Sequence, residues 1–265
     1  MRRRLIATMV LATALAVACA AIASAGSSTT FKIGNLEVVV KGGFSPRKLP
    51  RKKLASIHLW TSGAIRTTDG THPPALTEVV IETDKNGTIN ARGLPVCRLS
   101  RIKGTTTKVA RKACGRALVG EGKTDVEVKF PEMLPFIAHS KLLAFNGGVR
   151  GGKTTILIHA YLSNPVTAAV LTTVKVSKIH RGRYGTKSVA KIPLIAGGDG
   201  SVRSFNLKLF RKFKRRGKTQ SYLLARCRDG KLKARTKVFL TDFVEGTGKV
   251  QTPIGALSFP CTPKG

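Results

Sequence analysis

One segment of the sequence matches a nucleotide-binding motif letter for letter. Residues 147–154 are Gly-Gly-Val-Arg-Gly-Gly-Lys-Thr, which fits the G-x-x-x-x-G-K-T pattern of a phosphate-binding loop. That chemistry requires a helix starting at the Lys and Thr, so that backbone N–H groups and the helix dipole face the phosphates. Residues 155–162 are instead a β-branched, apolar run, which predicts a strand. We therefore expect a glycine-rich hairpin loop and no nucleotide or other cofactor.

Two short groups of acidic residues could carry out acid–base chemistry. Alternation places Glu78, Glu82 and Asp84 on one face of a predicted strand, and Asp125 and Glu127 on one face of another. Paired carboxylates at a suitable separation hydrolyse glycosidic bonds. A hydrolase of envelope polysaccharide is therefore the alternative function, provided that these groups line one cleft. The competing interpretation is structural: Asp84 opens an Asp-Lys-Asn-Gly turn, and the other acids act as counter-charges.

Positive charge is the strongest functional signal. The 265 residues include 47 Lys and Arg but only 13 Asp and Glu, a formal net charge of +34. Hydrophobic residues make up 42% of the chain, which is enough for a folded core and argues against disorder. Such a charge favours an anionic polymer or an anionic membrane surface as partner. Specific nucleic-acid recognition is not expected, because no base-reading motif is present and aromatic residues are only 6%.

The charge is densest between residues 203 and 237, where 14 Lys and Arg face a single acid, Asp229. Alternation predicts a hairpin that turns at Asp229-Gly230, with one basic face and one apolar face. In this register Arg228 lies opposite Lys231, Arg226 opposite Lys233, Leu224 opposite Arg235, and Tyr222 opposite Lys237. The predicted polyanion-binding residues are Arg211, Lys212, Lys214, Arg215, Arg216, Tyr222, Arg226, Arg228, Lys231, Lys233, Arg235 and Lys237. Residues 46–53 form a second basic segment, predicted as a loop.

The first 25 residues have the pattern of a signal peptide. Arg2, Arg3 and Arg4 precede the apolar residues 5–22, and Ala23-Ser24-Ala25 is an A-x-A cleavage site. Cleavage after Ala25 removes three arginines and leaves a charge of +31 on a secreted or cell-surface chain. Two alternatives remain open: lipidation at Cys19, and retention of the segment as an uncleaved anchor.

Cys97, Cys114, Cys227 and Cys261 are an even set in a chain that we expect to be exported, so disulfides are predicted. Three pairings are possible, and proximity in sequence favours Cys97–Cys114 with Cys227–Cys261. The five histidines are scattered, and none has metal-ligand spacing to a cysteine or to another histidine. No metal site is therefore expected.

A period of two in hydrophobicity dominates from residue 30 onward, with Gly, Asn and Asp at the turns. This pattern predicts an all-β fold, an antiparallel sandwich or barrel. The predicted strands cover residues 31–41, 56–60, 76–83, 125–130, 141–145, 154–162, 168–178, 202–212, 219–227, 231–240 and 248–257. At most one short helix is expected, near residues 107–114, with Thr106 or Thr107 as its cap and Gly115 in a left-handed conformation after it. Residues 26–265 are predicted as one exported domain that could divide into halves near 131–140.

Several short stretches resemble a family of exported proteins from high-GC Gram-positive bacteria. They are Asp69-Gly70-Thr71-His72-Pro73-Pro74-Ala75, Gly93-Leu94-Pro95-Val96-Cys97, Phe145-Asn146-Gly147-Gly148, Leu157-Ile158-His159-Ala160-Tyr161, Gly182-Arg183-Tyr184-Gly185-Thr186 and Ser221-Tyr222-Leu223-Leu224-Ala225-Arg226-Cys227. The resemblance covers nearly the whole mature chain, implies export, and brings no known activity or catalytic residues.

Together these features predict an exported, non-enzymatic β-protein that binds an anionic surface or polymer at the bacterial cell envelope. The alternatives are the polysaccharide hydrolase and a structural module whose charge serves only solubility.

Overall fold

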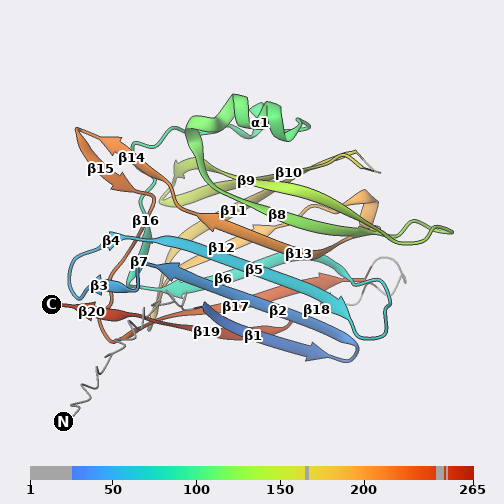
Figure 1. Ribbon diagram of the computed structural model, residues 1–265, viewed down its shortest axis with the longest axis horizontal. Coiled ribbons are helices and arrows are strands. Elements are labelled where there is room, and N and C mark those ends of the chain that lie inside the picture. The colour runs from blue at the N-terminus through green and yellow to red at the C-terminus, as the bar shows by residue number, and fades with distance from the viewer. Residues whose placement is uncertain (1–25, 165–166, 243–247, 249) are drawn as a thin grey trace, which may run out of the picture.

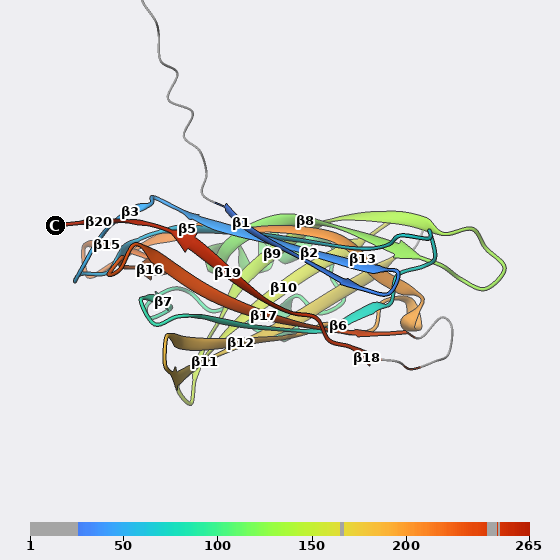
Figure 2. The ribbon, with the colours of Figure 1, turned by 90° about the horizontal axis from the view of Figure 1, so that it is seen from below.

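The computed structural model describes residues 26–164, 167–242, 248 and 250–265. The predicted signal peptide, with Cys19, lies outside these residues. A single 13-stranded antiparallel sheet dominates the fold and curls into a flattened, nearly closed barrel (Figures 1 and 2). The prediction of an all-β fold is confirmed.

The strands of this sheet follow the chain in a largely meandering order. Their bounds are β1 (Gly26–Ile33), β2 (Leu36–Ser45), β5 (His58–Thr67), β6 (Ala75–Asp84), β8 (Leu118–Val128), β9 (Phe136–Arg150), β10 (Lys153–Leu162), β11 (Ala168–Arg181), β12 (Tyr184–Lys191), β13 (Gly200–Leu209), β17 (Lys231–Thr241), β18 (Val250–Gln251) and β19 (Ile254–Pro260). Hydrogen bonding connects them in the order β1-β2-β5-β13-β8-β9-β10-β11-β12-β6-β17-β18, and β19 also pairs with β17. The backbone N–H of Ser258 on β19 donates to Ser27 Oγ on β1 at 3.2 Å, which brings the two edges of the sheet together.

Three small sheets gather at one end of the barrel, on the left in Figure 1. Their strands are β3 (Lys48–Pro50) with β20 (Thr262–Lys264), β14 (Lys212–Arg215) with β15 (Lys218–Ser221), and β16 (Leu223–Ala225) between β4 (Ala55–Ser56) and β7 (Gly87–Ile89). The helices are α1 (Thr107–Cys114) and the 3₁₀ turns η1 (Leu99–Arg101), η2 (Gly115–Ala117) and η3 (Ala196–Gly198). Within the described parts of the chain, no helix has the length and apolar character needed to cross a membrane.

The predicted strands over 76–83, 154–162, 168–178 and 231–240 agree with β6, β10, β11 and β17, whereas other predictions are shorter than the observed strands or run across a turn. The predicted strand over 31–41 is a hairpin, because Gly34 adopts φ +56° between β1 and β2. The predicted strand over 219–227 divides into β15 and β16, which belong to different sheets. Strand β12 was not predicted at all. The possible break near 131–140 spans the connection between β8 and β9, which are neighbours in the same sheet.

The Gly147–Thr154 motif forms a hairpin, as predicted. Strand β9 ends at Arg150 and β10 begins at Lys153, directly opposite. Gly151 and Gly152 form the two-residue turn with φ of +55° and +71°, values that favour glycine. The strand that follows offers no helix N-terminus to a phosphate.

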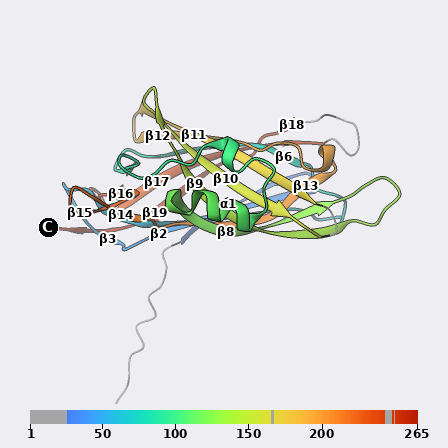
Figure 3. The same cartoon turned by 90° about the horizontal axis from the view of Figure 1, so that it is seen from above.

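Helix α1 lies across the outer face of β9 and β10 (Figure 3). Thr106 caps it: the N–H of Val109 donates to Thr106 Oγ1 at 3.3 Å. Gly115 is right-handed, not left-handed as predicted, because the chain continues directly into η2. Cys114 joins Cys97 in a disulfide within a separate core beneath the helix that includes Leu143, Phe145 and Leu157.

Both disulfides have the predicted pairing, Cys97–Cys114 and Cys227–Cys261. The first disulfide joins the loop before α1 to the C-terminal end of that helix. The second ties the chain between β16 and β17 to the C-terminal segment. Two bridges of this kind indicate that the protein folds in an oxidising, extracellular environment.

Side chains do not fill the barrel interior. Two apolar cavities of about 240 and 220 Å³ lie between its walls. An eight-stranded barrel is just wide enough for side chains to fill, and the interior widens as strands are added. Flattening brings the two walls of this larger sheet into contact, but only in part.

Removing either disulfide should destabilise the protein. The bridges close loops with sequence separations of 17 and 34 residues, so loop-closure entropy predicts losses of about 3 and about 4 kcal/mol in the free energy of unfolding. Urea unfolding of the double variants Cys97→Ser/Cys114→Ser and Cys227→Ser/Cys261→Ser measures this. A larger loss for the first variant would contradict the loop-length account.

Buried His159 should make stability fall in mildly acidic solution. Its Nε2 lies 2.8 Å from the Thr105 carbonyl, and Nδ1 has no hydrogen-bond partner among the described residues. Burial lowers the pKa of His159 below its ordinary value of 6.5. The unfolded chain therefore takes up this proton first, so the stabilising contribution of the neutral ring is complete above pH 6.5 and declines below it.

Urea unfolding across pH 7.5 to 5, at about half-unit steps, tests this. His159→Gln, which cannot take up the proton, should flatten the profile, whereas the matched substitution of exposed His180 by Gln should leave it unchanged. Identical profiles for the wild type and His159→Gln would refute the assignment.

Candidate functional site

Strand β17 presents charge outward and apolar groups inward, as its sequence predicts. Lys231 and Arg235 are exposed, and Lys233 and Lys237 are half-buried. The alternating residues Leu232, Ala234, Thr236 and Val238 are buried in the barrel. Two of the cations lie over aromatic rings: Arg235 over Tyr184 at 5.2 Å from the ring centroid, and Lys237 over Phe239 at 5.0 Å.

The predicted hairpin between residues 219–227 and 231–240 is wrong. Strand β17 pairs with β6 and β19, whereas β16 pairs with β4 and β7. None of the expected cross-strand pairs therefore forms, including Arg228 with Lys231 and Arg226 with Lys233. Pairing with β6 places Arg235 opposite Glu82, an attractive pair in place of like charges that repel.

Tyr222 does not lie on a basic face. It is fully buried in the main core, and burial raises the pKa of its phenol. Its backbone N–H donates to the Arg211 carbonyl at 2.8 Å, which fixes the start of the β14–β15 hairpin. Alternation failed here because the chain leaves one small sheet and enters another at this residue.

The tertiary structure brings the two predicted basic segments to the same end of the barrel. The β14–β15 hairpin, the β3–β4 segment, the chain around β16 and the C-terminal strand β20 all lie there in each view (Figures 1 to 3). Arg226 Nη1 donates to the Lys52 carbonyl at 3.3 Å, and the Arg51 N–H donates to the Lys264 carbonyl at 3.2 Å. We name this surface the basic end, defined by Lys48, Arg51, Lys52, Lys53, Lys212, Lys214, Arg215, Arg216, Lys218, Arg226, Arg228, Lys231 and Lys264.

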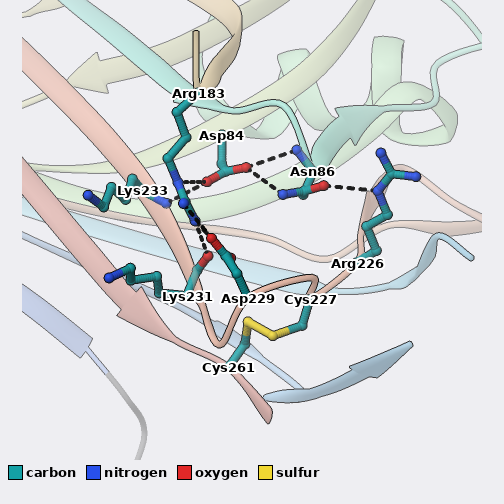
Figure 4. The surroundings of a disulfide bond; sticks show 9 residues. All are labelled: Asp84, Asn86, Arg183, Arg226, Cys227, Asp229, Lys231, Lys233 and Cys261. Atoms are coloured by element: carbon teal, nitrogen blue, oxygen red, sulfur yellow. Dashed lines mark hydrogen bonds and ion pairs between the residues drawn. A yellow bond between two sulfur atoms is a disulfide. The ribbon is translucent and has the colours of Figure 1, made fainter. Parts of the chain in front are cut away.

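Asp84 anchors the underlying structure (Figure 4). Its carboxylate is only 3% exposed and accepts four hydrogen bonds. Two come from the backbone and side chain of Asn86, at 3.0 and 2.9 Å, as expected for the Asp-Lys-Asn-Gly turn. The others come from Arg183 Nε at 2.8 Å and from the Lys233 N–H at 3.1 Å. One buried carboxylate therefore ties the ends of β6, β12 and β17 together.

Arg183 extends this network to the surface. Its guanidinium donates to Asp84, to both carboxylate oxygens of Asp229, and to the Lys231 carbonyl at 2.6 Å. Hydrogen bonding to Asp229 raises the pKa of Arg183 and lowers that of Asp229. Asp229, the one acid within the basic run, is thus held by an arginine outside that run.

Three of the other candidate carboxylates, Glu82, Asp125 and Glu127, have structural partners. Glu82 pairs with Arg235 and lies 3.8 Å from Arg181. Glu127 contacts His72 Nδ1 at 2.9 Å and Arg203 at 2.7 Å.

Asp125 lies 2.7 Å from His139 Nδ1 and accepts from Ser204 Oγ at 2.7 Å. These contacts, the His139 hydrogen bond first, lower the pKa of Asp125. Like Glu82 and Glu127, it serves as a counter-charge.

The candidate carboxylates lie on two strands that are not neighbours in the sheet. Glu78, Glu82 and Asp84 belong to β6, and Asp125 and Glu127 to β8, with four strands between them in the sheet order. Neither Asp125 nor Glu127 lines the two large cavities. Within the ranges that the structure describes, no three His, Cys, Asp or Glu side chains are grouped to hold a metal ion.

Two features of this region are not evident from the sequence pattern. Arg183 follows a Gly in a short turn and gives no local sign that it bridges two acids. Lys264 joins the basic end only because β20 pairs in parallel with β3. Both depend on contacts between residues distant in sequence.

No family model, curated protein or solved structure matches this chain.

Replacing Asp84 should be far more costly than replacing its exposed neighbour in the network. Asp84→Asn removes the buried charge that pairs with Arg183 Nε and leaves exposed Asp229 as the charged partner of this guanidinium, and we expect a loss of about 3 kcal/mol or more in the free energy of unfolding. Asp229→Asn is the matched control, because its side chain is 46% exposed and solvent replaces much of the lost interaction. Urea unfolding compares the two, and equal losses would show that Asp84 is not the anchor.

Proposed function

We propose that this protein is an exported, non-enzymatic β-protein that binds an anionic surface or polymer at the cell envelope through the basic end. The observation that carries the proposal is the convergence of separate basic segments. Residues 46–53, the β14–β15 hairpin and the C-terminal strand are far apart in sequence and meet at one end of the barrel. If the positive charge served only solubility, the basic residues would not have to gather at one end of the barrel.

The balance of charge at this end supports the proposal. Asp229 is held by Arg183, and Asp84 is buried with four donors. The exposed side chains of Lys212, Lys214, Arg215, Arg216 and Lys218 line a hairpin with no acid of its own. Their potential is therefore directed at solvent, where it attracts anions and speeds their association.

The backbone at this end is also well fixed, which lowers the entropy cost of binding. The Cys227 N–H donates to the Pro50 carbonyl at 3.0 Å, and the Thr262 N–H donates to the Arg47 carbonyl at 3.0 Å. The Cys227–Cys261 disulfide joins the same segments covalently. Long cationic side chains thus project from a constrained scaffold.

Export places the basic end beside its ligand. The signal-peptide pattern of residues 1–25 and the two disulfides support passage to an oxidising compartment. Polymers and lipids rich in phosphate or carboxylate are the anionic components that a basic protein meets at an envelope.

Charge removal at the hairpin tests the proposal. Binding of the purified protein to heparin and to phosphatidylglycerol vesicles should weaken steeply with salt, because bound cations release counterions from a polyanion. The variant Lys212→Gln/Lys214→Gln/Arg215→Gln/Arg216→Gln/Lys218→Gln should bind about tenfold or more weakly, with a shallower dependence of log affinity on log salt.

The matched control removes five exposed lysines from α1 and its surroundings: Lys103→Gln, Lys108→Gln, Lys112→Gln, Lys123→Gln and Lys141→Gln. It has the same net charge as the hairpin variant. Equal weakening by both variants would show that only the total charge matters and would favour the solubility role.

A further inference from the structure

The barrel interior offers a long apolar space. The larger cavity, about 240 Å³, and the smaller one, about 220 Å³, both include Thr61, Ile81 and Ser188 in their linings. They therefore meet near the middle of the barrel and extend toward opposite ends. Each is larger than the roughly 150 Å³ apolar cavity known to accept benzene.

The lining defines the chemistry of a ligand. The larger cavity is lined by Val, Ile, Leu, Ala and Phe side chains, and its polar groups are hydroxyls only. One of these, Thr124 Oγ1, donates to the Ser204 carbonyl at 2.8 Å and is thus already satisfied. Among the described residues no charged side chain lines this cavity, whereas the smaller cavity is mainly apolar but has Asp84 and Lys233 in its lining. An elongated, unbranched hydrocarbon chain fits such a lining, because it needs no polar partner along its length.

One end of this space continues to an exposed apolar loop. Leu162 and Ile195 line the larger cavity and belong to a small core against which Phe130 and Phe136 pack. Between these two phenylalanines the β8–β9 loop carries Leu134, which is 89% exposed. In Figure 1 this loop projects from the end of the barrel opposite the basic end. Apolar residues therefore follow one another from the exposed loop, through this small core, to the cavity wall.

We infer that the barrel interior binds one acyl chain, which reaches it past the β8–β9 loop. The chain belongs to a fatty acid or to a membrane lipid, since both present the same hydrocarbon. This inference rests on the cavities and the loop alone, and does not depend on the basic end.

A fluorescent fatty acid tests the inference directly. Titration with cis-parinaric acid should saturate with one probe bound per protein chain. Ser188→Phe places a large ring where the two cavities meet, and overpacking of this kind should lower the affinity roughly tenfold or more. Val189→Phe is the matched control on the same strand: Val189 is outside both linings, so the probe should bind as it does to the wild type.

If Ser188→Phe does not fold, Ala190→Leu takes its place as the cavity variant, because it places a smaller side chain in the larger cavity and should also weaken binding of the probe. Probe fluorescence that does not saturate, or equal affinity of the wild type and the folded cavity variant, would overturn the inference. Leu134→Asp should slow probe association, and an unchanged association rate would overturn the route past the loop.

Competition identifies the source of the chain. Displacement of the probe by oleic acid alone indicates a free fatty acid, and displacement also by dioleoylphosphatidylglycerol vesicles indicates a lipid chain; displacement by neither overturns the inference. These titrations are run at about 1 M salt, where charge interactions with the basic end are screened within roughly 3 Å. A protein that fails to bind polyanions can therefore still bind the probe in these titrations. A protein that fails to bind the probe can likewise still bind polyanions.

Discussion

Asp84 is a carboxylate that the fold removes from water and then satisfies completely. Its position at the end of β6 lets it accept from the Asn86 turn, from Arg183 and from the Lys233 backbone. A buried charge with fewer partners would destabilise the protein, so each of these segments must stay in place. The pairing of β17 with β6, and the path of the chain from Cys227 through Asp229 into β17, depend on this arrangement.

The same constraint shapes the distribution of charge. With 13 acids among 265 residues, cations are abundant around each acid, and arginine is a frequent partner because its fork can bond a carboxylate at more than one point. Glu82, Glu127 and Asp229 all have arginine partners. Eight other lysines and arginines, which have no carboxylate partner among the described residues, come together where the small sheets join unrelated basic segments; they are Lys48, Arg51, Lys52, Lys53, Lys212, Lys214, Arg215 and Arg216.

A sheet of this width cannot be packed as a small barrel is. Flattening brings Phe44, Leu142 and Leu207 into one core cluster, but these side chains also line the cavities, so the middle stays partly open. Small residues such as Ser188 and Ala190 face the interior where larger ones would have filled it. The basic end and the apolar interior thus arise from different features of the same fold, one from its ends and one from its width.

Local signals in the sequence determined much of this protein. Period-two hydrophobicity predicted the strands, glycines with positive φ marked the Gly151-Gly152 turn, and cysteine spacing gave both disulfides. The inward and outward faces of β17 were also correct, because alternation depends only on the strand itself. The pairing of strands was not predicted correctly, because any strand with a suitable face can pair with another. Only the tertiary structure decided that β17 joins β6, that Tyr222 is buried, that Arg183 bridges two acids, and that mainly apolar cavities lie between the walls, because each depends on contacts between residues far apart in the chain.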